Sequence, residues 1–213
     1  MKRTLAFAAS LLLLGACSSD GYTIRGKIAG LDNPYVYLLR YTGEVEVIDS
    51  AKVTKGDFVF KGKAEQPEVV YLSTDKQQPF VHFFLENGRI SVDGALSAPA
   101  DIAVLGTPSN DIQRAFDEKI AALEEEFAKT GNDVQRDSLR KEYSKLMSDA
   151  VEMNRDNIYG VTTFLNNAYA FLSPEEVMEQ IALFPAEWQQ RRELTELREA
   201  TERKLRVSAG HPY

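Results

Sequence analysis

Short runs of β-branched and aromatic residues, separated by turn residues, follow one another from Tyr22 to about Gly106. The runs are Tyr22–Ala29, Tyr35–Tyr41, Val45–Val53, Phe58–Lys63, Val69–Thr74, Phe80–Glu86, Arg89–Asp93 and Ile102–Leu105. Between the third and fourth runs, Thr54-Lys-Gly-Asp57 has a glycine where a hairpin turn favours positive φ. Because roughly 8–12-residue spacings without a helical period are typical of sandwiches and barrels, this part predicts a β-sandwich or barrel of about eight antiparallel strands.

A helical period replaces the strand pattern after Gly106. Apolar residues recur there at intervals of four, four, three and four residues, namely Ile112, Phe116, Ile120, Leu123 and Phe127. Further helices are predicted from about Asn132 to Met153, from Val161 to Tyr169 and from Ala186 to Leu205. Ser173-Pro174-Glu175-Glu176 forms a complete capping box, which predicts the start of one more helix. The sequence therefore predicts an α+β fold, with a β domain over residues 22–106 and a helical region of four to five helices over residues 107–208.

The first sixteen residues have the pattern of a signal peptide. Lys2 and Arg3 precede a twelve-residue apolar run from Leu5 to Ala16. A helix of that length cannot cross the ~30 Å hydrocarbon core of a bilayer. The run ends in Leu14-Gly15-Ala16-Cys17, which resembles the lipobox of bacterial lipoproteins.

The lipobox resemblance implies cleavage between Ala16 and Cys17, a diacylglyceryl group on the Cys17 sulfur and an acyl chain such as palmitate on the new amino terminus. The alternative is an ordinary secretory signal that contains a cysteine. Residues 17–21 would be the lipidated cysteine and a tether, in which residues 18–21 reach about 13 Å at ~3.3 Å per residue. Membrane lipid is thus the first expected partner. Ser18 resembles the pattern that is sorted to the outer membrane, so we expect a lipid-anchored protein of the cell envelope on that membrane, with the periplasmic and surface faces both open.

Composition excludes several classes of protein. The chain has 213 residues, one cysteine and a formal net charge of −7. One cysteine cannot form an intrachain disulfide, a CxxC redox centre or a cysteine-rich zinc site. The excess of acidic side chains argues against nucleic acid as a partner, because phosphate binding needs a concentrated basic surface. Residues 17–108 carry 9 basic and 12 acidic side chains and residues 109–213 carry 14 and 20, so the helical half is the more acidic.

Candidate catalytic and metal-binding residues are few. His82 lies on a predicted strand with Phe80 and Phe84 on the same face, which favours a partly buried imidazole over a catalytic base. The second histidine, His211, lies beyond the last predicted helix. Asp149, Glu152 and Asp156 share one side of the second helix, as a weak divalent-cation patch or, more simply, a solvated acidic stripe. We therefore predict no catalytic residue, no metal site and no cofactor.

One pattern indicates binding. Tyr35, Tyr37 and Tyr41 lie on the same side of one predicted strand. Tyrosine offers a large contact area with a polar tip, so this stripe could be a ligand or partner face. Packing across neighbouring strands explains it equally well.

Five strings together resemble a known module. They are Tyr22–Leu31, Val47–Lys63, Phe83–Gly94, Val104–Asp111 and Asn166–Glu176. In this order they are similar to an N-terminal domain of unknown function in lipid-anchored thiol-disulfide oxidoreductases of Gram-negative bacteria, related to peroxiredoxin-like proteins. In such proteins a thioredoxin-like domain with a CxxC pair follows. Residues 209–213 resemble the start of a linker to that domain, and no catalytic residue of the family transfers to this sequence.

Two functions follow as expectations. The first is a non-catalytic envelope lipoprotein that serves as a binding or scaffold module for an envelope protein partner. The alternative is the membrane-anchoring N-terminal part of a thiol-disulfide oxidoreductase whose thioredoxin-like catalytic domain lies outside this chain. Redox activity is expected only if that domain is supplied. A small-ligand carrier is a third possibility, which depends on the tyrosine stripe alone.

Overall fold

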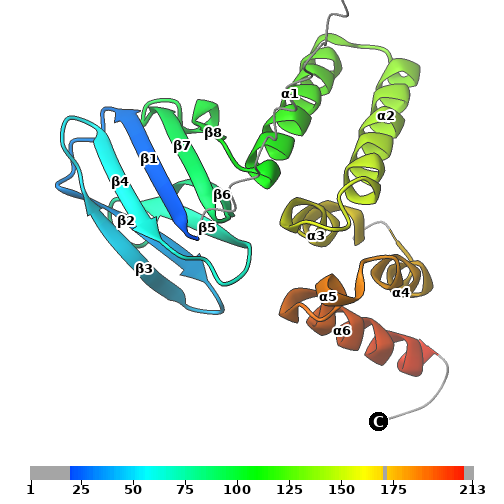
Figure 1. Cartoon of the computed structure of the whole chain (residues 1–213). Helices are drawn as coiled ribbons and strands as arrows, with labels where there is room; N and C mark the ends of the chain where they lie inside the picture. The colour runs from blue at the N-terminus through cyan, green and yellow to red at the C-terminus, as the bar shows by residue number, and fades with distance from the viewer. Residues whose placement is uncertain (1–19, 170–171, 209–213) are drawn as a thin grey trace, which may run out of the picture.

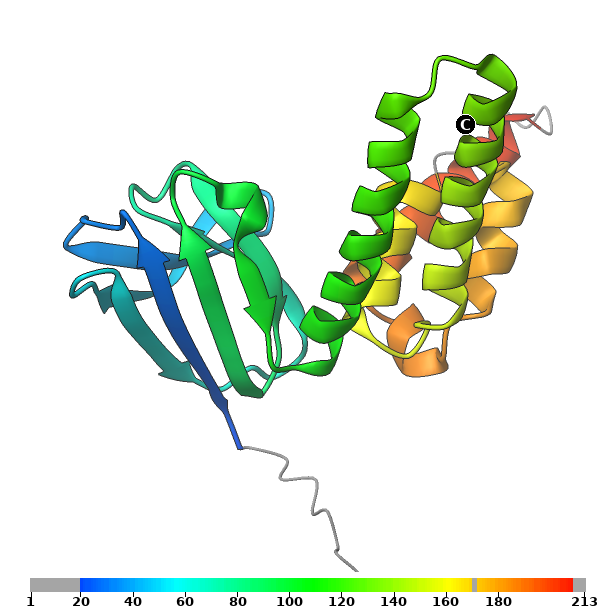
Figure 2. The same cartoon turned by 90° about the horizontal axis from the view of Figure 1, so that it is seen from above.

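The computed structural model describes residues 20–169 and 172–208 and contains a β-sandwich followed by a set of helices (Figure 1). The helices stand at one side of the sandwich (Figure 2). They do not cover the outer face of the sheet that contains the first strand, Tyr22–Ala29. The predicted α+β fold with eight N-terminal strands is confirmed, and a sandwich rather than a barrel is formed.

Eight strands form two four-stranded sheets. Sheet A has the order β4-β1-β7-β8, and sheet B has the order β3-β2-β5-β6. The strands are β1 (Tyr22–Ala29), β2 (Tyr35–Tyr41), β3 (Val45–Lys52), β4 (Asp57–Gly62), β5 (Glu68–Ser73), β6 (Pro79–Leu85), β7 (Gly88–Ala95) and β8 (Ala103–Leu105). A short 3₁₀-helix, η1 (Pro99–Asp101), connects the last two strands.

One strand pair departs from the predicted antiparallel pattern. β1 and β7 pair in parallel, with Tyr22 opposite Gly88 and Ile24 opposite Ile90. Parallel neighbours need a long crossover connection. Here that connection includes the whole of sheet B, because β2, β3, β5 and β6 all lie between β1 and β7 in the chain. The pairing could not be seen in the local alternation, which is the same for both orientations.

Strand alternation explains the core of the sandwich. In β1 the side chains of Tyr22, Ile24 and Ile28 are buried, whereas Arg25 and Lys27 are exposed. The same alternation in the facing sheet buries Phe83 and Leu85 of β6 against them. At the connection from β3 to β4, Lys55 and Gly56 have φ of 55° and 83°, which confirms the positive φ predicted at the glycine. The predicted hairpin is wrong, because β3 and β4 belong to different sheets.

The helices begin at Pro108. They are α1 (Pro108–Lys129), α2 (Asp133–Glu152), α3 (Ile158–Thr163), the π-helical turn η2 (Phe164–Ala168), α4 (Pro174–Ala182), α5 (Ala186–Gln189) and α6 (Arg192–Ser208). The capping box at Ser173 is confirmed: its hydroxyl accepts from the Glu176 N–H, and the Glu176 carboxylate accepts from the Ser173 N–H.

The single helix predicted from Ala186 to Leu205 is wrong. It is two helices, because the chain turns at Gln190–Arg191. At this turn Trp188 packs against two hydrophobic clusters, and Arg191 donates to the Pro67 carbonyl of the sandwich. Periodicity along the chain does not register such contacts with distant residues, so it extends the helix through the turn.

Two further cores hold the helices. The first lies within the helical part and contains Val151, Val161, Phe164, Val177, Ile181, Phe184 and Leu194. The second joins the helices to sheet B and contains Phe84, Phe116, Ala150, Ile158 and Tyr159. The sandwich and the helices are therefore attached by buried apolar surface.

Candidate functional site: a cleft between the sandwich and the helices

A cleft of about 1230 Å³ lies between sheet B and the helices. Since Leu72 and Phe83 point into the sandwich core, alternation directs Tyr71 and His82 outward into this cleft. The opposite wall is formed by α1, α3 and the turn between α5 and α6. Asp117, Tyr159 and Arg191 line it, one from each of these elements. The volume is somewhat above the roughly 300–1,000 Å³ that is typical of small-molecule pockets.

Aromatic rings form the base of the cleft. Phe84 of β6 meets Tyr159 edge to face, with ring centroids 6.1 Å apart. Phe116 of α1 stacks on the same tyrosine with centroids 5.5 Å apart. These rings are 3% to 6% exposed, so they bury most of their area at the junction. This packing sets the distance between the two walls.

Side-chain hydrogen bonds fix the start of α1 to the edge strand β6. The side-chain amide of Asn110 donates to the Phe84 carbonyl at 2.8 Å and to the Thr107 hydroxyl at 2.7 Å, and its oxygen accepts from the Phe84 N–H at 2.9 Å. The amide thus pairs with the strand edge as a further strand would. Next to it, the Glu86 carboxylate accepts from the backbone N–H and the hydroxyl of Ser109 at the helix start.

Three rings extend from the base of the cleft along sheet B, and we call them the aromatic ladder: Tyr41, Tyr71 and His82. Tyr41 and Tyr71 meet edge to face with centroids 4.6 Å apart. Tyr71 and His82 are opposite each other in the β5–β6 register, with centroids 6.0 Å apart. Tyr41 is 40% exposed, so the ladder offers aromatic surface to a ligand.

The cleft shifts the ionisation of three groups. Desolvation by the surrounding walls raises the pKa of the Asp117 carboxyl, although the residue as a whole is exposed; a hydrogen bond from Gln113 and electrostatic interactions with His82 and Arg114 oppose the shift. Burial raises the pKa of Tyr159 to about 12, although a hydrogen bond with the Thr163 side chain opposes the shift. Burial also raises the pKa of Tyr71. All three shifts favour neutral groups in the cleft.

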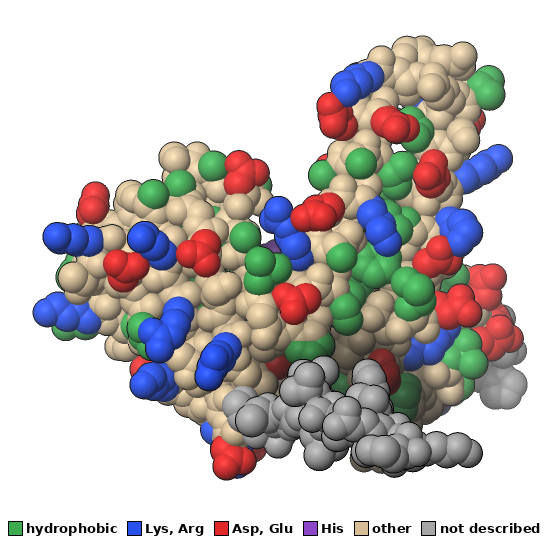
Figure 3. Space-filling model, turned by 45° about the horizontal axis from the view of Figure 1, so that its top comes forward, with side chains coloured by type: hydrophobic (Ala, Val, Ile, Leu, Met, Phe, Trp, Pro, Cys, Tyr) green, Lys and Arg blue, Asp and Glu red, His purple; other side chains and the backbone are tan. Residues whose placement is uncertain are grey.

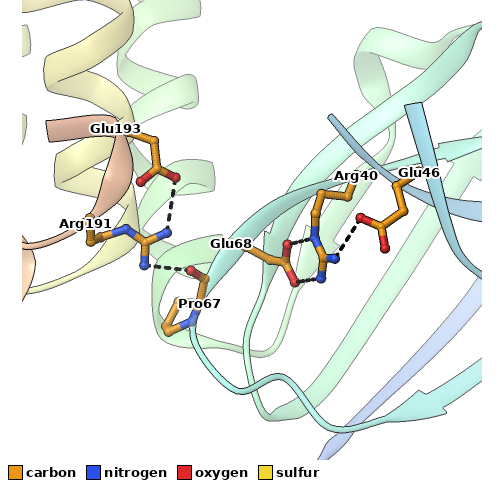
Figure 4. Close-up of polar contacts among 6 residues, drawn as sticks. All are labelled: Arg40, Glu46, Pro67, Glu68, Arg191 and Glu193. Carbon is orange, nitrogen blue, oxygen red and sulfur yellow. Dashed lines mark hydrogen bonds and ion pairs between the residues drawn. The ribbon is translucent and has the colours of Figure 1, made fainter. Parts of the chain in front are cut away.

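Two arginines at the end of the cleft are held by carboxylates and a carbonyl (Figure 4). Arg40 binds Glu68 through Nε and Nη2, and Nη1 lies 3.1 Å from Glu46. The bonds with Glu68 are the main reason why the pKa of Arg40 rises further above its ordinary value.

Arg191 joins the helices to the sandwich at the same end. Its side chain is 8% exposed and donates from Nη1 to the Pro67 carbonyl at 2.9 Å, while Nη2 lies 3.4 Å from Glu193. The guanidinium also lies over the Trp188 ring at 5.4 Å. Among the described residues its Nε is the one buried side-chain nitrogen or oxygen atom without a hydrogen-bond partner.

The predicted tyrosine stripe is divided by the structure. Tyr41 lines the cleft and belongs to the aromatic ladder. Tyr37 lies beneath Lys76, whose Nζ is 4.6 Å from the ring centroid. Tyr35 is 47% exposed at the other end of β2 and does not line the cleft. The stripe shares one side of β2 as expected, but only one of its members reaches the candidate site.

The other predicted residues have different outcomes. His82 is exposed at the junction of sandwich and helices, so the expectation of a partly buried imidazole is wrong (Figure 3). The reason is that β6 is an edge strand and only its Phe84 end is covered by the helices. In the acidic stripe, Asp149 pairs with Lys145, and the described part of the chain contains no group of three potential metal ligands. Ala16, Cys17 and His211 lie outside the described residues.

Three residues of the site were not identified from the sequence. Asn110 lies just before Ile112, the first residue of the helical period, and its hydrogen bonds to the distant Phe84 leave no local pattern in the sequence. Asp117 and Arg191 are charged residues on amphipathic helices, and most such residues are simply solvated. The one available signal was the break in helical period near Arg191, where Gln189, Gln190, Arg191 and Arg192 follow one another without an apolar residue.

The sandwich and the start of α1 define a recognisable domain. Residues 22–113 match the family model of a domain of unknown function, DUF4369. This range contains four of the five strings on which the resemblance was based, and the fifth, Asn166–Glu176, lies beyond it. Neither a curated protein nor a solved structure matches the chain. Within the described residues, no helix is both long and apolar enough to cross a bilayer.

Proposed function

We propose that this protein is a non-catalytic, lipid-anchored binding module of the cell envelope, and that it holds a segment of an envelope protein partner in the cleft. The observation that carries this proposal is the aromatic ladder exposed along a cleft of about 1230 Å³. Exposed tyrosines at a concave site are typical of recognition surfaces, because the rings lose little conformational entropy on binding.

The charges of the cleft support a peptide rather than an anionic small molecule. Its arginines are already paired, Arg40 with Glu68 and Arg191 with Glu193. Asp117 takes part in none of the ion pairs between described residues, and it lies beside the aromatic ladder near His82. A Lys or Arg side chain of a partner would meet both a carboxylate and aromatic faces there. The proposed partner segment therefore carries a basic residue.

The chain provides a matched pair of variants for the test. Tyr41 and Tyr35 are both exposed tyrosines on the same side of β2, but only Tyr41 lines the cleft. The mature protein would be used to capture partners from envelope extract, with Tyr41→Ala and Tyr35→Ala in parallel. Capture of a defined partner should be lost with Tyr41→Ala and kept with Tyr35→Ala. Equal capture by both variants, or capture of nothing by the native protein, would contradict the proposal.

The second candidate is the membrane-anchoring part of a thiol-disulfide oxidoreductase. The match of residues 22–113 to DUF4369 supports the domain resemblance from which this candidate arises. The association with a thioredoxin-like domain rests on the sequence resemblance alone. Reading the coding DNA beyond codon 213 tests this candidate, because the absence of any in-frame or adjacent thioredoxin-like segment with a CxxC pair would rule it out. For the chain itself we expect no reduction of insulin by dithiol chemistry, and measurable reduction would overturn that expectation.

A further inference from the structure

The outer face of sheet A is basic, in contrast to the chain as a whole. Alternation directs the side chains of Arg25, Lys27, Lys61 and Arg89 outward from β1, β4 and β7, and we call these four residues the basic face. All four are exposed, and none takes part in an ion pair of residues 20–169 and 172–208. Figure 3 shows Lys and Arg side chains gathered on this side of the sandwich. The net charge of the chain is −7, so the face is a local exception.

The positive charge is concentrated at one end of the strands. Thr23 is opposite Lys61 on one side and Arg89 on the other, which places these two cations about 10 Å apart across three strands. Arg25 lies two residues further along β1 on the same face. Towards the other end of the sheet, Lys27 is flanked in register by Asp57 and Asp93, which offset its charge.

The positive end is also where the proposed lipid anchor enters the fold. Cys17 precedes Tyr22 by five residues, and a fully extended chain of that length spans at most about 18 Å. The three cations Lys61, Arg89 and Arg25 begin one residue after Tyr22 in the β1 register. Glu86, the carboxylate nearest to Arg89 in the chain, is bound to Ser109, and Asp20 and Glu65 belong to the segments before β1 and after β4.

We propose that the basic face docks onto an anionic membrane surface, with Lys61, Arg89 and Arg25 against the lipid phosphates. The proposal rests on the lipid anchor of the proposed function. The acyl chains expected on Cys17 hold the protein on the membrane but do not fix its orientation, and a neighbouring basic patch adds electrostatic attraction that does. The acidic helices do not prevent docking, because charges beyond the ~8 Å Debye length are screened at physiological salt.

Docking in this way would orient the candidate site. The cleft lies on the side of sheet B, and the basic face is the outer surface of sheet A, on the opposite side of the sandwich. With sheet A against the lipid, the cleft and the aromatic ladder point away from the membrane and remain open to a partner. The exposed side chains of Val59 and Leu105 lie on the same outer face as the cations and would contact the interfacial region.

The single cysteine allows a direct test. The mature chain, from residue 17, is coupled through the Cys17 thiol to a maleimide lipid in vesicles of phosphatidylcholine, with or without 30% phosphatidylglycerol as a chosen test composition. Acetylation rates of Lys27 and Lys61 are measured by mass spectrometry relative to Lys141, which is exposed on α2. We expect both lysines to react several-fold more slowly on the anionic vesicles, and the difference to disappear in high salt.

Two matched double variants decide the assignment. Arg25→Gln with Arg89→Gln leaves both reporter lysines in place and should weaken docking by about 25-fold, at about fivefold per cation. Arg140→Gln with Arg203→Gln changes the net charge equally on the helices and should leave the protection intact. Equal lysine reactivity on both kinds of vesicle would overturn the proposal, and so would equal loss of protection in the two double variants. Neither result bears on the cleft, whose partner binding is tested separately with Tyr41→Ala.

Discussion

Replacing Asn110 by alanine should destabilise the protein strongly, because its amide satisfies buried backbone groups of another element. Asn110 is 2% exposed, and the alanine variant would leave the N–H and the carbonyl of Phe84 without their partners. An unsatisfied buried polar group costs about 1–3 kcal/mol, so two such groups predict a loss of about 2–6 kcal/mol in the free energy of unfolding. Domains typically have only about 5–15 kcal/mol in total.

Urea denaturation provides the measurement, followed by far-UV circular dichroism and by the fluorescence of Trp188, the only tryptophan of the chain. At an m-value of about 2 kcal/mol/M, the midpoint should fall by about 1–3 M. Asn132→Ala is the matched control, since Asn132 is an exposed N-cap that accepts from the Val134 N–H at 2.9 Å. Its loss should be only about 1 kcal/mol.

A second variant tests the mechanism rather than the size of the effect. Asn110→Asp keeps an acceptor for the Phe84 N–H but replaces the amide donor by a carboxylate oxygen beside the Phe84 carbonyl. It should therefore be about as damaging as alanine. If Asn110→Ala lost no more stability than Asn132→Ala, the reasoning would be refuted, and water would have to reach the edge of β6.

Three further predictions concern packing, titration and capping. Gly26→Ala should cost about 1–3 kcal/mol, because its Cβ would lie 1.9 Å from the Phe58 ring, whereas Gly131→Ala meets nothing within 4 Å and should be neutral or slightly stabilising in a thermal melt. For Tyr159, the folded pKa of about 12 exceeds the ordinary value of 10.0, so its contribution to stability is complete below pH 10 and is lost as the pH rises towards 12. Tyr159→Phe should therefore show a shallower decline of unfolding free energy over this range in urea titrations, and parallel curves would contradict the assignment. Ser173→Ala should lower stability by about 1 kcal/mol through loss of the capping box, and a melting temperature equal to that of the native protein would argue against it.

The strands and most of the helices could be predicted because their signals are local. In β1 the alternation of apolar and polar residues reports which face is buried, whatever strand lies beside it. The capping box at Ser173 is a contact within four residues, and the turn at Lys55–Gly56 depends on the conformational freedom of glycine. Such features need no knowledge of the rest of the fold.

The sheet order, the cleft and its polar contacts required the tertiary structure. The parallel pairing of β1 with β7, the bonds of Asn110 to Phe84 and the contact of Arg191 with Pro67 join residues that are 26 to 124 positions apart, or strands separated by a whole sheet. Local sequence determines which face of an element is apolar, and therefore that a sandwich and a set of amphipathic helices form. Which of these faces meet, and which charges remain unpaired beside them, depends on long-range packing, because the same alternation and the same helical period are compatible with many arrangements.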